Sequence, residues 1–123
     1  MAALSKFIDE VASPPLAPAD DAIDLHHLAR MTLGERSLER EVLALFDRQA
    51  MMLLLRMSSG GPNAVAAAHT LKGSALGIGA WHVARAAEAV EQADAAKFAA
   101  AIAALSLAVE EARLAIADLL LGH

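Results

Sequence analysis

Apolar residues recur at helical spacing along nearly the whole of this chain. Residues 36–57 are predicted to form a long helix, whose inner side would carry Leu38, Val42, Leu45, Phe46 and Leu53. The most regular pattern is in the last segment, where steps of four and three alternate through Phe98, Ile102, Leu105, Val109, Ala112, Ile116 and Leu119. A seam of this kind must be covered by partner helices. No segment shows the alternation of a strand.

Short breaks divide the region between these two helices. Residues 58–63, Ser-Ser-Gly-Gly-Pro-Asn, end the first helix and begin another that should run to about Leu76. Glycines at 77 and 79 would then loosen or bend the chain, and a further helix should follow from Ala80. Asp94 is expected to cap or mark the turn into the last helix. Four long helices joined by short turns predict an all-α fold, an antiparallel four-helix bundle.

The N-terminal part predicts two shorter helices. Residues 2–12 place four apolar side chains on one face of an amphipathic helix, and the proline-rich residues 13–18 form a linker. Asp24 is expected to cap a second short helix over residues 25–33. We therefore divide the chain into an N-terminal helix and linker over 1–20 and a bundle domain over 21–123. The short helices should pack against the bundle or cap one end of it.

Composition excludes several classes of function. The chain has 123 residues, no cysteine and a net charge of −5, and no cluster of Lys and Arg could follow a nucleic-acid backbone. Although 57% of the residues are hydrophobic, many are alanine, and the apolar run at 50–55 is far shorter than the roughly 20 residues that a bilayer needs. Asp9 and Glu10 interrupt the first segment, which does not resemble a signal peptide. We expect a cytoplasmic monomer that binds neither nucleic acid nor membrane.

The helix through His69 carries the candidate chemistry. At 100° per residue, one side of this helix collects the apolar residues Ala67, Leu71, Ala75 and Ile78. The opposite side, within about 60° of His69, collects Val65, Lys72, Gly73 and Leu76. If the apolar side is buried, His69 points into solvent. The pattern therefore disfavours a core histidine.

These neighbours suit a nucleophile that must meet a bulky partner. An imidazole has a reference pKa of about 6.5, so at neutral pH it is mostly unprotonated and can attack phosphorus. Lys72, one turn later, could neutralise an added phosphoryl group. Gly73 leaves room beside the histidine, and this clearance would justify a mid-helix glycine, which costs about 1 kcal/mol relative to alanine.

The same residues carry a family resemblance. His69-Thr-Leu-Lys72-Gly73-Ser74, followed by Gly79, resembles the His-x-x-Lys-Gly-Ser/Ala signature of histidine-phosphotransfer (HPt) domains. Residues 24–25, 45–46 and 86–91 resemble the usual flanks, so that the match covers about residues 21–121. The resemblance implies that His69 accepts a phosphoryl group from a receiver-domain aspartate or a histidine kinase and returns it to another aspartate. It also implies that Lys72 and Gly73 support the site, and that magnesium is bound by the receiver while this chain needs no cofactor.

Two further features concern partners and metals. Val65 and Leu76 should surround the histidine with apolar docking surface, joined by the exposed side of Met51 and Leu55, with Lys72 as the only nearby cation. Packing against the N-terminal helices explains the apolar run at 51–55 equally well. The remaining histidines that could be imagined as ligands are His26, His27 and His82. Their spacing matches no metal motif, so we expect no metal site.

Two other functions fit a helical bundle with a histidine. One is the dimerisation and phosphoacceptor domain of a histidine kinase, in which an acidic residue typically follows the histidine; here Thr70 follows it. The other is a scaffold or interaction protein that is never phosphorylated. Because the chain has no glycine-rich ATP-binding segment, it is expected to be a phosphocarrier without kinase activity of its own.

Overall fold

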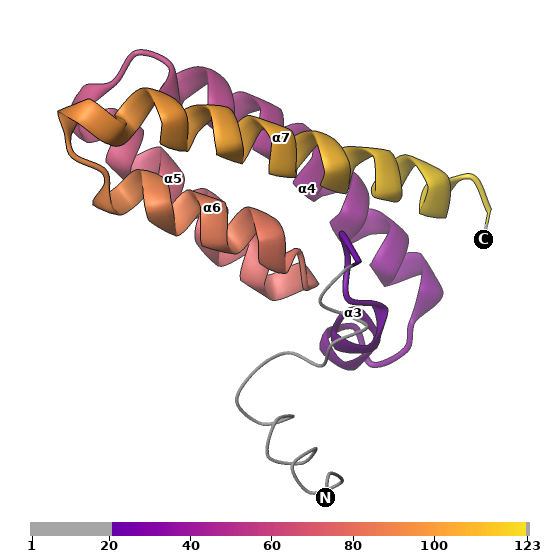
Figure 1. The fold of residues 1–123 in the computed structure, drawn as a ribbon. Helices are drawn as coiled ribbons and strands as arrows, with labels where there is room; N and C mark the ends of the chain where they lie inside the picture. The colour runs from indigo at the N-terminus through magenta and orange to yellow at the C-terminus, as the bar shows by residue number, and fades with distance from the viewer. Residues whose placement is uncertain (1–20, 123) are drawn as a thin grey trace, which may run out of the picture.

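The computed structural model describes residues 21–122, and these residues are all-α (Figure 1). Their helices are α3 (Leu25–Met31), α4 (Arg36–Met57), α5 (Gly61–Ile78), α6 (Trp81–Gln92) and α7 (Ala95–Leu120). The amphipathic helix and the linker predicted over residues 1–20 lie outside the described residues.

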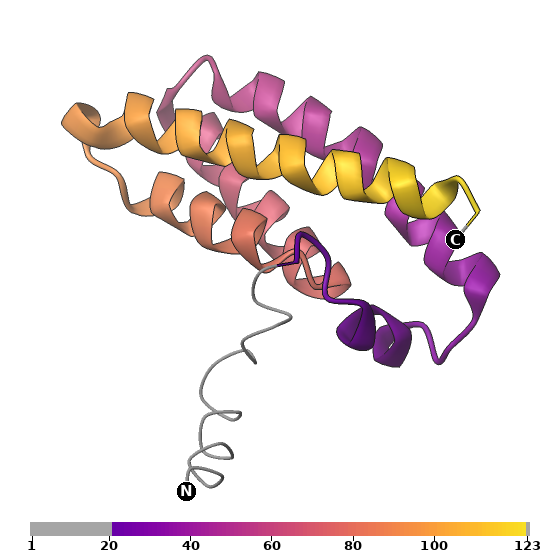
Figure 2. The ribbon, with the colours of Figure 1, turned by 45° about the vertical axis from the view of Figure 1, so that its right-hand side comes forward.

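The four long helices form an antiparallel bundle. Each of α4, α5 and α6 packs against the helix that follows it, and α7 also packs against α4, which closes the ring. Figures 1 and 2 show the four helices lying side by side with their directions alternating. In this ring α5 and α7 occupy opposite corners. This arrangement confirms the predicted fold class.

Helix α7 turns the predicted seam toward the core. Leu105, Val109, Ala112 and Ile116 are buried, and the outer members of the seam, Phe98, Ile102 and Leu119, are partly buried against them. Asp94 begins the helix by accepting a hydrogen bond from the backbone N–H of Lys97 at 3.0 Å. The alternation of four and three residues therefore identified the buried side of α7 correctly.

The predicted inner side of α4 was partly wrong. Phe46 and Leu53 are buried as expected, but Leu38 and Leu45 are 38% and 54% exposed. The other buried side chains of this helix are Leu43, Ala50 and Met57. Because apolar and charged side chains both occur on several sides of α4, spacing alone could not decide which stripe faces α5 and α7.

Helix α3 caps one end of the bundle, at the corner where α5 ends and α6 begins. The carboxylate of Asp24 accepts hydrogen bonds from the backbone N–H of His27 at 3.1 Å and from Nε1 of Trp81 at 3.0 Å. The backbone N–H of Asp24 donates to the carbonyl of Gly79 at 2.9 Å. Nε2 of His27 lies 2.9 Å from the carbonyl oxygen of Leu76, to which it donates. These contacts tie α3 to the last turn of α5.

Gly79 makes that close approach possible. Its φ is +80°, in the left-handed region, and it ends α5. A Cβ at this position would lie 3.0 Å from both the Cβ and the carbonyl oxygen of Asp24. Gly77, by contrast, lies within the helix and does not end it. Helix α5 therefore continues two residues past the predicted end at Leu76.

None of the helices in the described part of the chain is long and apolar enough to cross a membrane.

Candidate functional site

His69 lies in the middle of α5 on the side that faces solvent. Its side chain is 70% exposed. The residues predicted to form the opposite side, Ala67, Leu71, Ala75 and Ile78, are all buried. The rotation of α5 is therefore the one that the sequence pattern predicted.

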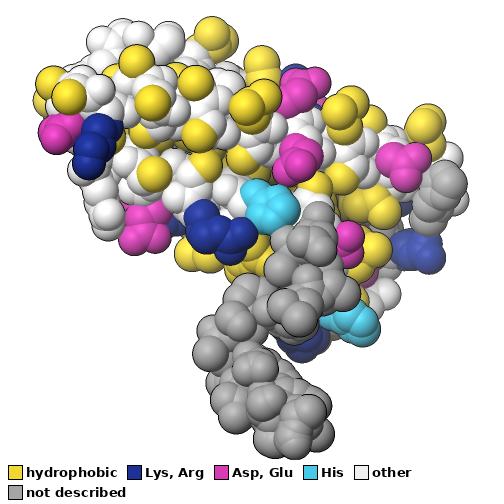
Figure 3. Space-filling view, viewed as in Figure 1, with side chains coloured by type: hydrophobic (Ala, Val, Ile, Leu, Met, Phe, Trp, Pro, Cys, Tyr) yellow, Lys and Arg dark blue, Asp and Glu magenta, His cyan; other side chains and the backbone are white. Residues whose placement is uncertain are grey.

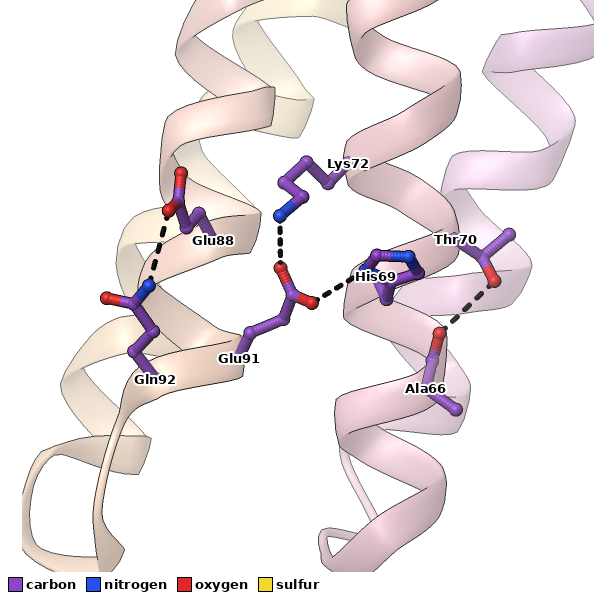
Figure 4. Close-up of polar contacts among 7 residues, drawn as sticks. All are labelled: Ala66, His69, Thr70, Lys72, Glu88, Glu91 and Gln92. Atoms are coloured by element: carbon purple, nitrogen blue, oxygen red, sulfur yellow. Dashed lines mark hydrogen bonds and ion pairs between the residues drawn. The ribbon is translucent and has the colours of Figure 1, made fainter.

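A carboxylate from the neighbouring helix joins His69 to Lys72. Oε2 of Glu91, on α6, lies 2.8 Å from Nδ1 of His69, and its Oε1 lies 2.9 Å from Nζ of Lys72. Figure 4 shows the Glu91 side chain reaching from α6 to the two α5 side chains, which stand one turn apart. The side chain of Glu91 is 17% exposed and that of Lys72 is 25% exposed, so this pair is more sheltered than the imidazole.

The charge of Glu91 determines the tautomer of His69. The hydrogen bond from Lys72 lowers the pKa of Glu91 below its usual value of 4.5, and the hydrogen bond from His69 lowers it further, although burial acts in the opposite direction. Glu91 is therefore ionised at neutral pH, and an ionised carboxylate can only accept hydrogen bonds. Nδ1 of a neutral His69 must then carry the proton. Nε2 keeps its lone pair, on the side of the ring turned away from Glu91 (Figure 4).

Lys72 and Gly73 border the imidazole. The hydrogen bond to Glu91 raises the pKa of Lys72, so its ammonium stays protonated. A Cβ built at Gly73 would meet nothing within 4 Å, which leaves open space beside the histidine. Thr70, the next residue along from His69, donates its hydroxyl to the carbonyl of Ala66 at 3.1 Å. Its side chain is turned away from Glu91 (Figure 4).

The structure brings two of the predicted docking residues to this face. Val65 and Leu76 lie on α5 at either side of His69 and are 43% and 45% exposed. Leu76 also lines a groove between α5 and α6 together with Lys72, Trp81, Ala84, Arg85 and Glu88. Arg85 places a second cation beside Lys72, which corrects the expectation that Lys72 would be the only one nearby.

The other two predicted docking residues lie elsewhere. Met51 and Leu55 are exposed, but each is about 160° around α4 from the buried Leu53. Helix α4 meets α5 on another side, where Oγ of Ser74 donates to Gln49 at 3.0 Å. The structure therefore does not bring Met51 and Leu55 to the His69 face.

Sequence reasoning did not assign a role to Glu91 or Arg85. In the sequence, residues 86–91 resemble only a flank of the family pattern, yet they contain the carboxylate that contacts His69. The available signal was that this acidic helix follows the histidine helix after a very short turn and must therefore lie beside it. Which of Glu88 and Glu91 reaches the histidine depends on the rotation of α6. In the structure Glu88 instead accepts from Gln92 at 3.2 Å.

The remaining histidines make separate contacts. His27 packs edge-on against Trp81, with ring centroids 4.8 Å apart. Nδ1 of His82 lies 3.3 Å from Glu111. Within residues 21–122, no three His, Asp or Glu side chains are grouped so that they could hold a metal ion.

Comparisons with known proteins point to one family. The model of the Hpt domain family matches residues 36–115 of the chain. The crystal structure of the histidine phosphotransferase ShpA from Caulobacter crescentus is 30% identical in sequence, with a TM-score of 0.65. The similarity covers 79% of this chain and 88% of that one. No curated protein matches the chain.

Proposed function

This chain belongs to the Hpt domain family, and we propose that it relays a phosphoryl group through a phosphohistidine at His69. The donors and acceptors would be receiver domains of response regulators, with a histidine kinase as an alternative donor. The observation that carries the proposal is the exposed imidazole whose Nδ1 is held by Glu91 at 2.8 Å, because this contact directs the lone pair of Nε2 to solvent.

The transfer step follows from this geometry. The Nε2 lone pair attacks the phosphorus of an aspartyl phosphate, the N–P bond forms, and the bond from phosphorus to the aspartate oxygen breaks. The aspartate leaves as a carboxylate. No proton has to move, because Nδ1 keeps its hydrogen and the phosphorylated ring becomes cationic. Glu91 then faces a cation, so its charge stabilises the phosphorylated state.

Lys72 and Gly73 serve the same step in different ways. The ammonium of Lys72 lies one turn from His69 and would attract the phosphoryl oxygens. It is shared with Glu91, so it is positioned before the partner arrives. The open space at Gly73 would let the partner's active site approach the imidazole.

The remaining chemistry is assigned to the partner. We propose that the receiver binds the magnesium ion that neutralises the phosphoryl group during transfer, and that this chain acts as a carrier without kinase activity. ATP alone should then leave the chain unlabelled. Label should enter only from a phosphorylated partner.

The test uses the full chain and a panel of purified receivers charged with radiolabelled acetyl phosphate. We expect acid-labile label on the wild-type chain and on the control variant His26→Gln, and none on His69→Gln. His69 is largely exposed, so the free energy of unfolding of His69→Gln should stay within about 1 kcal/mol of the wild type. Label that persists on a folded His69→Gln would move the site to another histidine. A wild-type chain that no receiver labels would support the scaffold function instead.

A further inference from the structure

The outward side of α7 carries a row of exposed leucines. Leu107, Leu114 and Leu121, the last of which directly follows the helix, are spaced one heptad apart and are 73%, 64% and 79% exposed. Between and before them the same side carries exposed alanines, among them Ala100, Ala103 and Ala117. A surface helix of a monomeric bundle normally presents charged and polar side chains there. We call these leucines and alanines the α7 outer seam.

The charges beside the C-terminal half of this seam are of one sign. Glu110, Glu111 and Asp118 are exposed within 60° of the leucine row, all in the C-terminal half of the helix. Arg113, in the same half, is directed toward α4 and donates from Nε to Asp47 at 2.7 Å. Figure 3 shows hydrophobic side chains in a row along α7, with acidic side chains among them toward the C-terminal end. The carbonyl end of the helix adds negative potential in the same place.

From this arrangement we propose that the α7 outer seam binds an amphipathic helix of another protein, with an apolar stripe flanked by Lys and Arg. Leucines at heptad spacing form one half of a two-helix seam, and the alanines allow a second helix to approach closely. The acidic flank requires basic residues opposite the C-terminal half of α7. The partner helix should therefore carry its cations toward one end.

A second copy of this chain fits the seam less well. Any pairing that brings the three leucines of two copies together also brings Glu110 and Asp118 of one copy close to acidic residues of the other. Like charges at such positions oppose association. Charge complementarity therefore favours a different, basic partner.

The position of the seam makes this partner compatible with phosphotransfer. Helices α5 and α7 occupy opposite corners of the bundle, so the outer side of α7 faces away from the His69 face. A protein bound at α7 would leave Nε2 of His69 accessible. The seam could thus hold the carrier near one protein while a receiver exchanges the phosphoryl group at the other side.

The probe is a synthetic amphipathic helix of roughly 21 residues, or three heptads, with a leucine and alanine seam flanked by Lys and Arg. A second peptide has the same seam flanked by Glu. Binding to the full chain is measured by titration calorimetry and by NMR shifts. The test variant is Leu107→Gln/Leu114→Gln. The matched control is Leu45→Gln/Leu55→Gln, which changes two leucines that are also exposed, on α4. Leucine and glutamine have similar helix propensities, so both variants should fold.

We expect the basic peptide to bind the wild type and the control equally and to shift resonances of α7. Its affinity should fall at least tenfold on the α7 variant, and the Glu-flanked peptide should bind the wild type at least tenfold more weakly. Added salt should weaken the binding of the basic peptide to the wild type.

Three results would overturn the proposal: no binding of the basic peptide, equal binding to the α7 variant, or equal binding of the two peptides. A wild-type dimer in sedimentation equilibrium that the α7 variant abolishes would make a second copy the occupant. His69 labelling by receivers is measured separately, so failure here leaves the phosphotransfer test intact.

Discussion

Nδ1 of His69 and Oε2 of Glu91 lie 2.8 Å apart, and this contact decides which ring nitrogen can react. The two residues are 22 positions apart in the chain and come from adjacent antiparallel helices. An ionised Glu91 holds the proton on Nδ1 and would stabilise a positive charge on the ring after phosphorylation.

Replacing Glu91 should therefore slow phosphotransfer. In Glu91→Gln the side-chain oxygen can still accept from Nδ1, but its negative charge is lost. A hydrogen bond to a charged group contributes about 1.5–3 kcal/mol, and partial solvent exposure reduces this to about 1 kcal/mol. We expect transfer from a phosphorylated receiver to slow about fivefold, and the ¹⁵N shifts of the His69 ring to show more of the Nε2–H tautomer. Glu41→Gln is the control, because Glu41 is an exposed carboxylate on α4, outside the groove beside His69. Equal rates in the two variants would contradict this role.

The same carboxylate should make stability depend on pH in the acid range. Folding lowers the pKa of Glu91 below 4.5, chiefly through the hydrogen bond from Lys72. The stabilisation is therefore complete above the unfolded pKa and is lost as the pH falls through the lower folded value. Denaturant unfolding at about pH 7 and about pH 3 should show a difference between wild type and Glu91→Gln that is larger at the higher pH than at the lower. The difference should stay below about 1 kcal/mol because the pair is partly exposed. A constant difference would contradict the assignment.

Gly73 should separate stability from function. Because a Cβ there would meet nothing within 4 Å, Gly73→Ala should raise the free energy of unfolding by up to about 1 kcal/mol through helix propensity alone. Gly73→Gln should fold equally well but obstruct the receiver, and transfer should slow at least tenfold. Melting curves and transfer rates measured on both variants decide this. Normal transfer in Gly73→Gln would show that clearance is not the reason for the glycine.

Gly79 and Gly77 should respond in opposite directions to the same substitution. At Gly79 an alanine must adopt a φ of +80° and would press on Asp24 at 3.0 Å, so Gly79→Ala should destabilise the domain by at least about 1 kcal/mol. At Gly77 a Cβ would meet nothing within 4 Å, so Gly77→Ala should stabilise the domain by up to about 1 kcal/mol through helix propensity. Chemical denaturation measures both. Because Trp81 is the single tryptophan of the chain and bonds to Asp24, its emission should change only in Gly79→Ala.

The spacing of apolar residues predicted which side of a helix is buried where one side is distinctly apolar. The strict seam of α7 and the four apolar residues opposite His69 both gave the correct rotation of their helices. Helix α4 shows the limit of this reasoning. Leu38 and Leu45 are predicted inside but are exposed, because α4 carries apolar residues on several sides and its neighbouring helices decide which of them is buried.

The parts of the site that the sequence could not provide are contacts between helices. Glu91 reaches His69 only because of the rotation of α6, and Arg85 reaches the groove beside Lys72 for the same reason. The contact of Asp24 with Trp81 spans 57 positions. Local spacing holds no information about such pairs, whereas His69, Lys72 and Gly73 lie within a single turn and could be found together.

The groove beside His69 should govern the affinity for receivers. Leu76, Lys72, Arg85 and Glu88 line it, so it combines an exposed apolar side chain with two cations and one carboxylate. A receiver that offers an aspartate-bearing active site should be attracted by those cations, and Arg85→Gln should lower the association rate several-fold and weaken its dependence on salt. Leu76→Asp removes apolar contact and adds a like charge, so the affinity should fall at least tenfold. Leu55→Asp, on the outer side of α4, should have no effect. Titration of an unphosphorylated receiver into labelled protein, followed by NMR at low and high salt, tests all three variants. Shifts confined to α7, away from residues 65–76, would refute a docking face centred on His69.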